Sequence, residues 1–218
     1  MRCITNYLAT TSLLTAAMIW SGAMTHAESP ILIEPGRLVD NQPTGLFYKI
    51  DVETSGRVNT RTWLFLGENR ITRVHPYGGR MFDPSRCSPD TCGSYAISSK
   101  KITVHWDGSS LENWTFETTT DGIQLNNSAF QPARPMTAAA LIGKWSAAGG
   151  NVYTFDANGR FSFGADSAPG LGGTYRVQGL TLTLTFDDGD MRHRTLFGAS
   201  AVEPIGMISV DGETYARK

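Results

Sequence analysis

The sequence predicts an all-β protein built as an antiparallel meander, and two patterns carry this prediction. Apolar residues alternate with threonines from Leu180 to Phe186, and Ile102, Val104 and Trp106 repeat the alternation. Strict alternation is typical of a strand with one buried face. Asx-Gly dipeptides separate such runs at positions 107–108, 121–122, 158–159, 188–189 and 211–212. Because these residues tolerate positive φ, each dipeptide predicts a tight hairpin.

Helical structure contributes little to the predicted fold. The one helical candidate is a short segment at 137–142. Parallel strands need long crossovers that are usually helical, so their absence favours antiparallel pairing of neighbouring strands.

The two halves of the chain resemble each other, which predicts an internal duplication. TWLFLGENRITR from Thr62 aligns with VYTFDANGRFSF from Val152, and GSYAIS aligns with GTYRVQ, so that Tyr95 falls on Tyr175. Further matches pair Trp63 with Tyr153, Phe65 with Phe155, Arg70 with Arg160, Gly93 with Gly173, Ile102 with Leu182, Trp106 with Phe186, Asp107 with Asp187, Ile123 with Ile208, Leu125 with Val210 and Phe130 with Tyr215. We therefore expect a signal peptide at 1–27, an N-terminal arm at 28–44, repeats at 45–133 and 143–218, and a linker with a short helical turn at 134–142.

The first 27 residues read as a secretory signal peptide. Arg2 precedes an apolar stretch from Leu8 to Trp20, and small residues occupy the cleavage positions that end at Ala27. The apolar stretch is too short to span a bilayer comfortably. We expect a periplasmic or secreted protein without stable membrane insertion after cleavage.

The charge balance argues against a nucleic-acid partner, and the cysteine content agrees with export. The chain has 19 basic and 20 acidic residues, a balance that creates no overall field to attract nucleic acid. After signal cleavage two cysteines remain, Cys87 and Cys92, and an even count in an oxidising compartment predicts a disulfide. No metal site is expected, because these cysteines and His75 lack a fourth ligand at a recognisable spacing.

The second repeat resembles the bacterial lipocalin-like (calycin) β-barrels. It reads LIGKW, YTFDANGRFSF, GTYRVQG and LTLTFDDG, and the resemblance covers 137–218 with a degenerate copy at 45–133. It implies that Gly143-x-Trp145 opens the first strand, that the indole closes one barrel end, and that a small apolar molecule binds in a barrel mouth. Both two small barrels and one merged barrel fit the pattern. Side chains can fill small barrels and leave no cavity.

Candidate binding residues come from a loop and from the barrel walls. The segment 75–92 is long for a hairpin connection, and long loops on rigid β scaffolds are where binding function concentrates. It contains Tyr77, Arg80, Phe82 and Arg86 beside the predicted disulfide, a composition typical of a protein-contact surface. The aligned tyrosines Tyr95 and Tyr175 complete the set as barrel-lining aromatics, for which plain core packing is the alternative.

The sequence contains no linear catalytic motif, and no catalytic residue or cofactor is expected. His75, His105 and His193 are not spaced for a shared metal. These features favour an exported, non-enzymatic binding protein of the cell envelope. Two alternatives stay open: a protein-partner binder or inhibitor acting through 75–92, and an envelope hydrolase with dispersed carboxylates such as Asp51, Asp83, Asp90 and Asp107.

Overall fold

Antiparallel strands joined in chain order dominate the computed structural model, which describes residues 31–54, 58–79, 81–166, 170–199 and 205–218. The predicted signal peptide at 1–27 and the candidate residue Arg80 lie outside the described residues. The expected all-β antiparallel class is confirmed.

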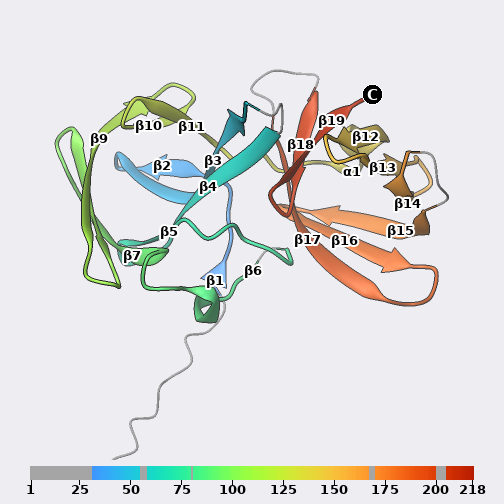
Figure 1. The fold of residues 1–218 in the computed structure, drawn as a ribbon, viewed down its shortest axis with the longest axis horizontal. Helices are drawn as coiled ribbons and strands as arrows, with labels where there is room; N and C mark the ends of the chain where they lie inside the picture. The colour runs from blue at the N-terminus through green and yellow to red at the C-terminus, as the bar shows by residue number, and fades with distance from the viewer. Residues whose placement is uncertain (1–30, 55–57, 80, 167–169, 200–204) are drawn as a thin grey trace, which may run out of the picture.

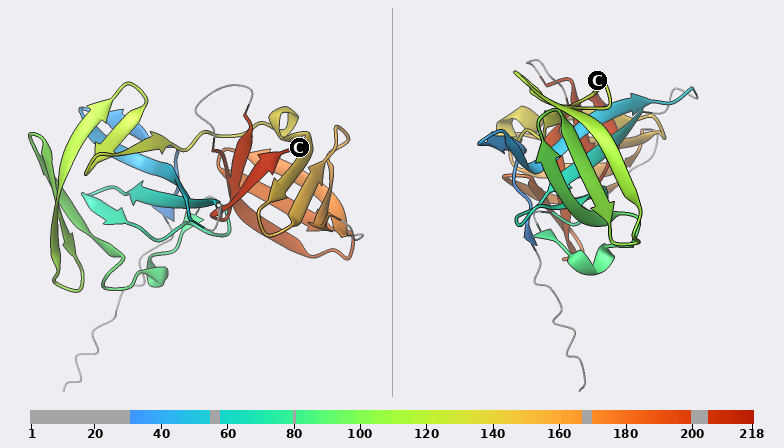
Figure 2. Two further views of the ribbon diagram at one scale, coloured as in Figure 1. Left: turned by 45° about the horizontal axis from the view of Figure 1, so that its top comes forward. Right: turned by 90° about the vertical axis from the view of Figure 1, so that its left-hand side faces the viewer.

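Hydrogen-bonded strand pairs close two rings. In barrel 1 the closing pair is β11 with β3, and in barrel 2 it is β12 with β19. Barrel 1 consists of β3 (Gln42–Val52), β4 (Val58–Phe65), β5 (Arg70–Thr72), β7 (Cys92–Ser98), β8 (Lys101–Trp106), β9 (Leu111–Thr119), β10 (Gly122–Leu125) and β11 (Ser128–Pro132). Barrel 2 consists of β12 (Gly143–Ala147), β13 (Asn151–Phe155), β14 (Arg160–Ala165), β15 (Leu171–Gln178), β16 (Thr181–Phe186), β17 (Met191–Gly198), β18 (Met207–Val210) and β19 (Glu213–Arg217). The two barrels lie side by side, with β4 and the β18–β19 hairpin between them (Figures 1 and 2).

The five Asx-Gly dipeptides connect consecutive antiparallel strands. They join β8 to β9, β9 to β10, β13 to β14, β16 to β17 and β18 to β19. In the β18–β19 turn both Asp211 and Gly212 have positive φ, 47° and 87°, as a two-residue hairpin requires.

The N-terminal arm is more regular than the sequence suggested. It contains β1 (Ile31–Leu32) and β2 (Arg37–Val39), and β3 begins inside it at Gln42. Asp40 and Asn41 form the β2–β3 turn with φ of 51° and 62°. The turn was missed because these two residues adopt left-handed φ without a glycine.

The segment 75–92 also contains regular structure. Its β6 (Met81–Phe82) pairs with β1, and a 3-10 helix, η1 (Pro84–Arg86), follows. Cys87 and Cys92 are joined by the expected disulfide.

The short helix forms where it was expected, as α1 (Ala138–Leu141). The Thr137 hydroxyl caps it by accepting a hydrogen bond from the Ala140 amide at 3.1 Å. The buried indole of Trp145 in β12 donates to the Leu141 carbonyl at 2.7 Å. The helix is thereby fixed against barrel 2.

Corresponding positions in the two rings make the same contacts. Arg70 forms an ion pair with Asp107 in barrel 1, and Arg160 pairs with Asp187 in barrel 2, both at 2.9 Å. Gly93 pairs with Trp106 as Gly173 pairs with Phe186. The amides of Tyr95 and Tyr175 each donate, at 2.8 Å, to the carbonyl at the end of a preceding turn, Asn69 or Gly159.

Separate apolar clusters fill the two barrels, and a third joins them. The joining cluster combines Leu46, Tyr48 and Leu64 of barrel 1 with Phe197 and Ala199 of barrel 2. The rings of Tyr48 and Phe197 lie 5.0 Å apart. Because β3 packs Phe47 inside its barrel and Leu46 and Tyr48 against barrel 2, this part of the strand is buried on both faces.

Candidate functional site

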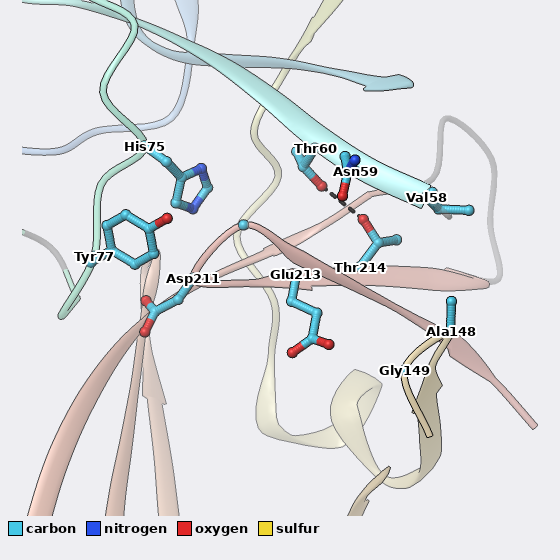
Figure 3. Close-up of a pocket in the computed structure, with 11 residues that line it drawn as sticks. Val58, Asn59, Thr60, His75, Tyr77, Ala148, Gly149, Asp211, Glu213 and Thr214 are labelled. Carbon is cyan, nitrogen blue, oxygen red and sulfur yellow. Dashed lines mark hydrogen bonds between the residues drawn. The ribbon is translucent and has the colours of Figure 1, made fainter. Parts of the chain in front are cut away.

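A polar cleft of about 900 Å³ opens at the junction of the two barrels (Figure 3). It is formed by the start of β4, the segment after β5, the β12–β13 turn and the β18–β19 hairpin. Its lining consists of Val58, Asn59, Thr60, His75, Tyr77, Ala148, Gly149, Asp211, Gly212, Glu213 and Thr214.

His75 lies at one side of the cleft, with its imidazole packed between the barrels. Nδ1 lies 3.3 Å from the Thr62 hydroxyl, and Nε2 is buried without a hydrogen-bond partner among the described residues. The ring meets Tyr77 edge to face at 5.1 Å and lies against Gly212, where a Cβ would be only 3.2 Å from it. Burial, with a smaller contribution from the positive charge of Arg86, lowers the pKa of His75 to about 4. The imidazole is therefore neutral at pH 7.

A strap, residues 73–79, crosses from barrel 1 to barrel 2 beside His75 and is hydrogen-bonded there. The Gly78 amide donates to Asp211 Oδ1 at 3.3 Å, and the Thr195 hydroxyl donates to the Gly79 carbonyl at 2.9 Å. Asp211 also accepts from the Thr195 amide at 2.7 Å and from Arg194 Nη1 at 2.9 Å. One carboxylate thus connects the strap, β17 and the turn between β18 and β19.

Most other polar groups of the cleft already have protein partners. The hydroxyls of Thr60 and Thr214 lie 2.9 Å apart across the junction, and the Tyr215 hydroxyl donates to Glu213 Oε2 at 2.6 Å. A ligand in the cleft would compete with these contacts. The large volume of the cleft is therefore not enough to make it a better candidate than the second cavity, which is described next.

The mouth of barrel 2 is a second cavity, of about 190 Å³, which shares Asp211 and Glu213 with the cleft. The mouth pocket, as we call it, has aromatic and aliphatic walls and two arginines. It is lined by Tyr153, Phe163, Leu171, Phe186, Arg192, Arg194, Val210, Asp211, Glu213 and Tyr215. The Tyr153 ring lies 4.4 Å from that of Phe163 and 5.2 Å from that of Tyr215.

Two hydrogen-bond donors of this pocket have no partner among the described residues. Arg194 uses Nη1 for Asp211, but its Nε is buried and unpaired. Tyr153 is only 4% exposed, and its hydroxyl makes no hydrogen bond within the described part of the chain. Burial raises the pKa of Tyr153 to about 12, and the charges that act on it include Arg194, Asp211 and Glu213, which also line the pocket. The buried Arg194 Nε carries a desolvation cost, whereas the Tyr153 hydroxyl is not among the fully buried unpaired atoms of the described residues.

The corresponding end of barrel 1 is filled by tryptophan side chains. Trp63 lies 5.9 Å from Trp106 and 4.9 Å from Trp114, measured between ring centroids. By strand register Trp114 pairs with Ile102 as Arg194 pairs with Leu182. Because Ile102 aligns with Leu182, the arginine of barrel 2 occupies the position that a third indole takes in barrel 1.

The sequence-predicted loop residues do not meet at one site. Tyr77 lines the cleft, is 45% exposed and has the guanidinium of Arg86 over its ring at 4.7 Å. Arg86 itself is exposed, whereas Phe82 is buried in the cluster that joins the barrels. Phe82 pairs with Ile31 in the β1–β6 ladder, and its side chain faces the protein interior, where it is buried.

The two predicted barrel tyrosines pack in the cores. Tyr95 is buried in barrel 1 beside Phe65, and its hydroxyl donates to the Pro43 carbonyl at 3.2 Å. Tyr175 is half-buried in barrel 2, and its hydroxyl donates to the Asp156 carbonyl at 3.0 Å. Neither residue lines the cleft or the mouth pocket.

The inward-facing arginines of β17 were missed by sequence reasoning. Arg192, Arg194 and Leu196 alternate along the strand, and Leu196 belongs to the core of barrel 2. The alternation that placed Leu196 inside could also have placed the arginines on the inner face. Tyr153 was recognised as an aligned aromatic but not as a site residue.

Three of the four dispersed carboxylates have structural roles. Asp51 forms ion pairs with Lys49 and Arg61, Asp107 with Arg70, and Asp83 caps η1. The described residues contain no cluster of three or more metal-ligating side chains. Within the same ranges, no helix has the length and hydropathy that a membrane crossing needs.

A comparison with protein-family models, with curated proteins and with solved structures finds no match for this chain. A proposal for its function therefore rests on the fold and on the geometry of the two cavities.

Proposed function

We propose that this chain is an exported, non-enzymatic binding protein of the cell envelope that holds a small, largely apolar molecule in the mouth pocket of barrel 2. The observation that carries the proposal is a pocket with aromatic walls, lined also by Arg192 and Arg194, at the end of an otherwise filled barrel. Ligand pockets typically combine apolar walls with a few polar groups of this kind.

A tandem, lipocalin-like architecture is part of the proposal. It is supported by the ring of eight strands in each half, by the matched ion pairs of Arg70 and Arg160, and by the buried Trp145 at the start of barrel 2. Export to the periplasm or beyond is supported by the disulfide between Cys87 and Cys92, because such bonds persist in oxidising compartments.

Native mass spectrometry of the protein, purified from the periplasm without refolding, tests the proposal. We expect a non-covalent adduct that is lost on denaturation. Arg194→Trp introduces the side chain that fills barrel 1 and should abolish the adduct, whereas Tyr77→Ala in the cleft should leave it intact. A bare mass for the wild-type protein would argue against a ligand carrier, and an adduct sensitive only to Tyr77→Ala would place the ligand in the cleft.

A second candidate, binding of an envelope protein through 75–92, is favoured by one specific observation. Leu32 and Met81 are cross-strand neighbours in the β1–β6 ladder and are 49% and 42% exposed. Together with Tyr77 they place apolar side chains on the surface near the disulfide. A partner captured by the wild-type protein but not by Leu32→Asp would support this mode, and capture by both would count against it.

A further inference from the structure

We infer that the free edge of β3 is a docking site for an extended segment of a partner protein, which joins barrel 1 as an added strand. The surface shares no lining residue with the mouth pocket, so this inference goes beyond the proposed function and does not depend on it. Three features lead to it: the length of β3, the unpaired backbone groups along one edge, and a groove beside that edge.

The strand β3 extends further than its counterpart in barrel 2. By strand register Phe47 in β3 corresponds to Trp145 in β12. The strand β12 ends at Ala147, the counterpart of Lys49, whereas β3 continues to Val52. One edge of this extension is paired with β4 as far as its last residue, and β4 is in turn bridged to β19 of barrel 2. The extension is therefore held in place from one side.

The other edge of the extension has no partner strand in the described part of the chain. Alternate residues of an antiparallel strand direct their N–H and C=O groups to the same side. Leu46 faces away from β4, because its amide donates to the Glu34 carbonyl and its carbonyl accepts from the Ala133 amide, both at 2.9 Å. Ile50 and Val52 face the same way, and their backbone groups have no partner there among the described residues.

A groove of about 450 Å³ lies beside this edge. It exists because the closing strand β11 pairs with β3 only through Gln131 with Tyr48 and Pro132 with Phe47, and then diverges from it. The unpaired edge of β3 forms one wall, and β11 forms another. Residues of barrel 2 complete the lining, among them Ala199 and Met207.

The groove fits a chain in which apolar and polar side chains alternate. Successive side chains of a strand point to opposite faces of the sheet. On one face an added strand would meet the side chains of Ile50, Ala129 and Met207, and on the other it would meet the ion pair of Lys49 with Asp51 at 3.0 Å. In strand addition the backbone hydrogen bonds supply affinity and the alternate side chains supply specificity.

The outer face of this edge lacks the usual protection against strand addition. Natural edge strands are commonly blocked by charged side chains or prolines. Here the outward-facing residues are Ile50 and Val52, and Val52 is 69% exposed. A partner strand would cover this apolar surface.

Selection of a phage-displayed library of random peptides, each about eight residues long and so able to span the free edge, tests the inference on the purified full protein. The enriched peptides should alternate apolar and polar residues. In an NMR experiment the best peptide should slow amide hydrogen exchange at Ile50 and Val52 at least tenfold. The amides of Lys49 and Asp51 already face β4, so their exchange should change little.

Proline substitutions at two free edges separate strand addition from other binding. Val52→Pro removes an amide that is unpaired in the free protein, a position where proline is tolerated, and should weaken the peptide by about tenfold. Leu38→Pro is the matched control, because Leu38 lies on β2, which pairs with β3 alone, and its amide faces away from β3. If thermal melts show that Val52→Pro does not fold, Val52→Lys, which places a charge on the edge, should weaken the peptide instead.

Four results would overturn the inference. They are enrichment of no peptide above a blank surface, protection of Leu38 in place of Ile50 and Val52, equal effects of the substitutions at positions 38 and 52, and slow exchange of the Ile50 and Val52 amides in the free protein. Arg194→Trp, which fills the mouth pocket, should leave peptide binding intact. Loss of the native adduct together with retained peptide binding would therefore separate the two sites.

Discussion

Lowering the pH from 7 to 5 should destabilise this protein through His75. The pKa of the buried imidazole is about 4 in the folded protein, whereas an unfolded histidine has a pKa of about 6.5. Between these values the unfolded chain binds more protons than the folded one, so stability falls as the pH drops through this window. Above pH 6.5 the imidazole is neutral in both states, and the effect disappears.

The expected size follows from the two pKa values. From pH 6.5 to pH 5 the unfolded state gains about 1.36 kcal/mol per pH unit, which gives at most about 2 kcal/mol. Partial exposure of the ring reduces this figure, so we expect a loss of about 1–2 kcal/mol. The lowered pKa values of Asp83 and Asp166, the latter about 2, affect stability only below about pH 4. They therefore do not interfere in this window.

Urea denaturation at pH 7, 6 and 5 measures the effect. His75→Gln keeps a polar partner for Thr62 but cannot titrate, so its unfolding free energy should change less over this range than that of the wild type. His193→Gln, at an exposed histidine, is the matched control and should retain the wild-type slope. Equal pH slopes for the wild type and His75→Gln would refute the reasoning, whatever the absolute stability of the variant.

Three further results are expected. Replacing Cys87 and Cys92 by serine should cost about 2 kcal/mol for a loop this short, measured by urea unfolding under non-reducing conditions; two free thiols in the unfolded wild type would contradict the bond. Thr195→Val removes the partner of the Gly79 carbonyl and should cost about 1–3 kcal/mol, with faster amide exchange at Gly79 as the local readout; unchanged exchange would show that the strap is held by other contacts. Gly173→Ala places a Cβ 2.1 Å from a backbone oxygen and should lower the melting temperature by several degrees. An unchanged melting temperature would show that the neighbouring strand can move aside to accommodate the methyl group.

The sequence predicted the strand pattern because the information for it is local. Alternation fixes which face of a strand is buried, and Asx-Gly pairs adopt the positive φ values of hairpins. All five dipeptides, the short helix and the disulfide lie where these signals placed them. The Asp40–Asn41 turn was lost because no glycine marks it.

The sites were not predictable in the same way, because they depend on which strands become neighbours around a ring. Tyr77 and Phe82 are close in sequence, yet one lines the cleft and the other is buried between the barrels. Conversely, Tyr153 and Arg194 lie on β13 and β17, which are not paired, and meet at the mouth only because barrel 2 closes. Ring closure is a property of long-range pairing that no local signal encodes.

By itself, the sequence determined the antiparallel all-β class, the hairpin positions and the alternation that gives β8 and β16 an apolar face. Only the tertiary structure decided that the Arg194 position forms a pocket in barrel 2, whereas its counterpart in barrel 1 is filled by Trp114. The physical reason is packing. Three indoles fill the end of one barrel, and in the other an arginine held by Asp211 leaves space and an unpaired donor.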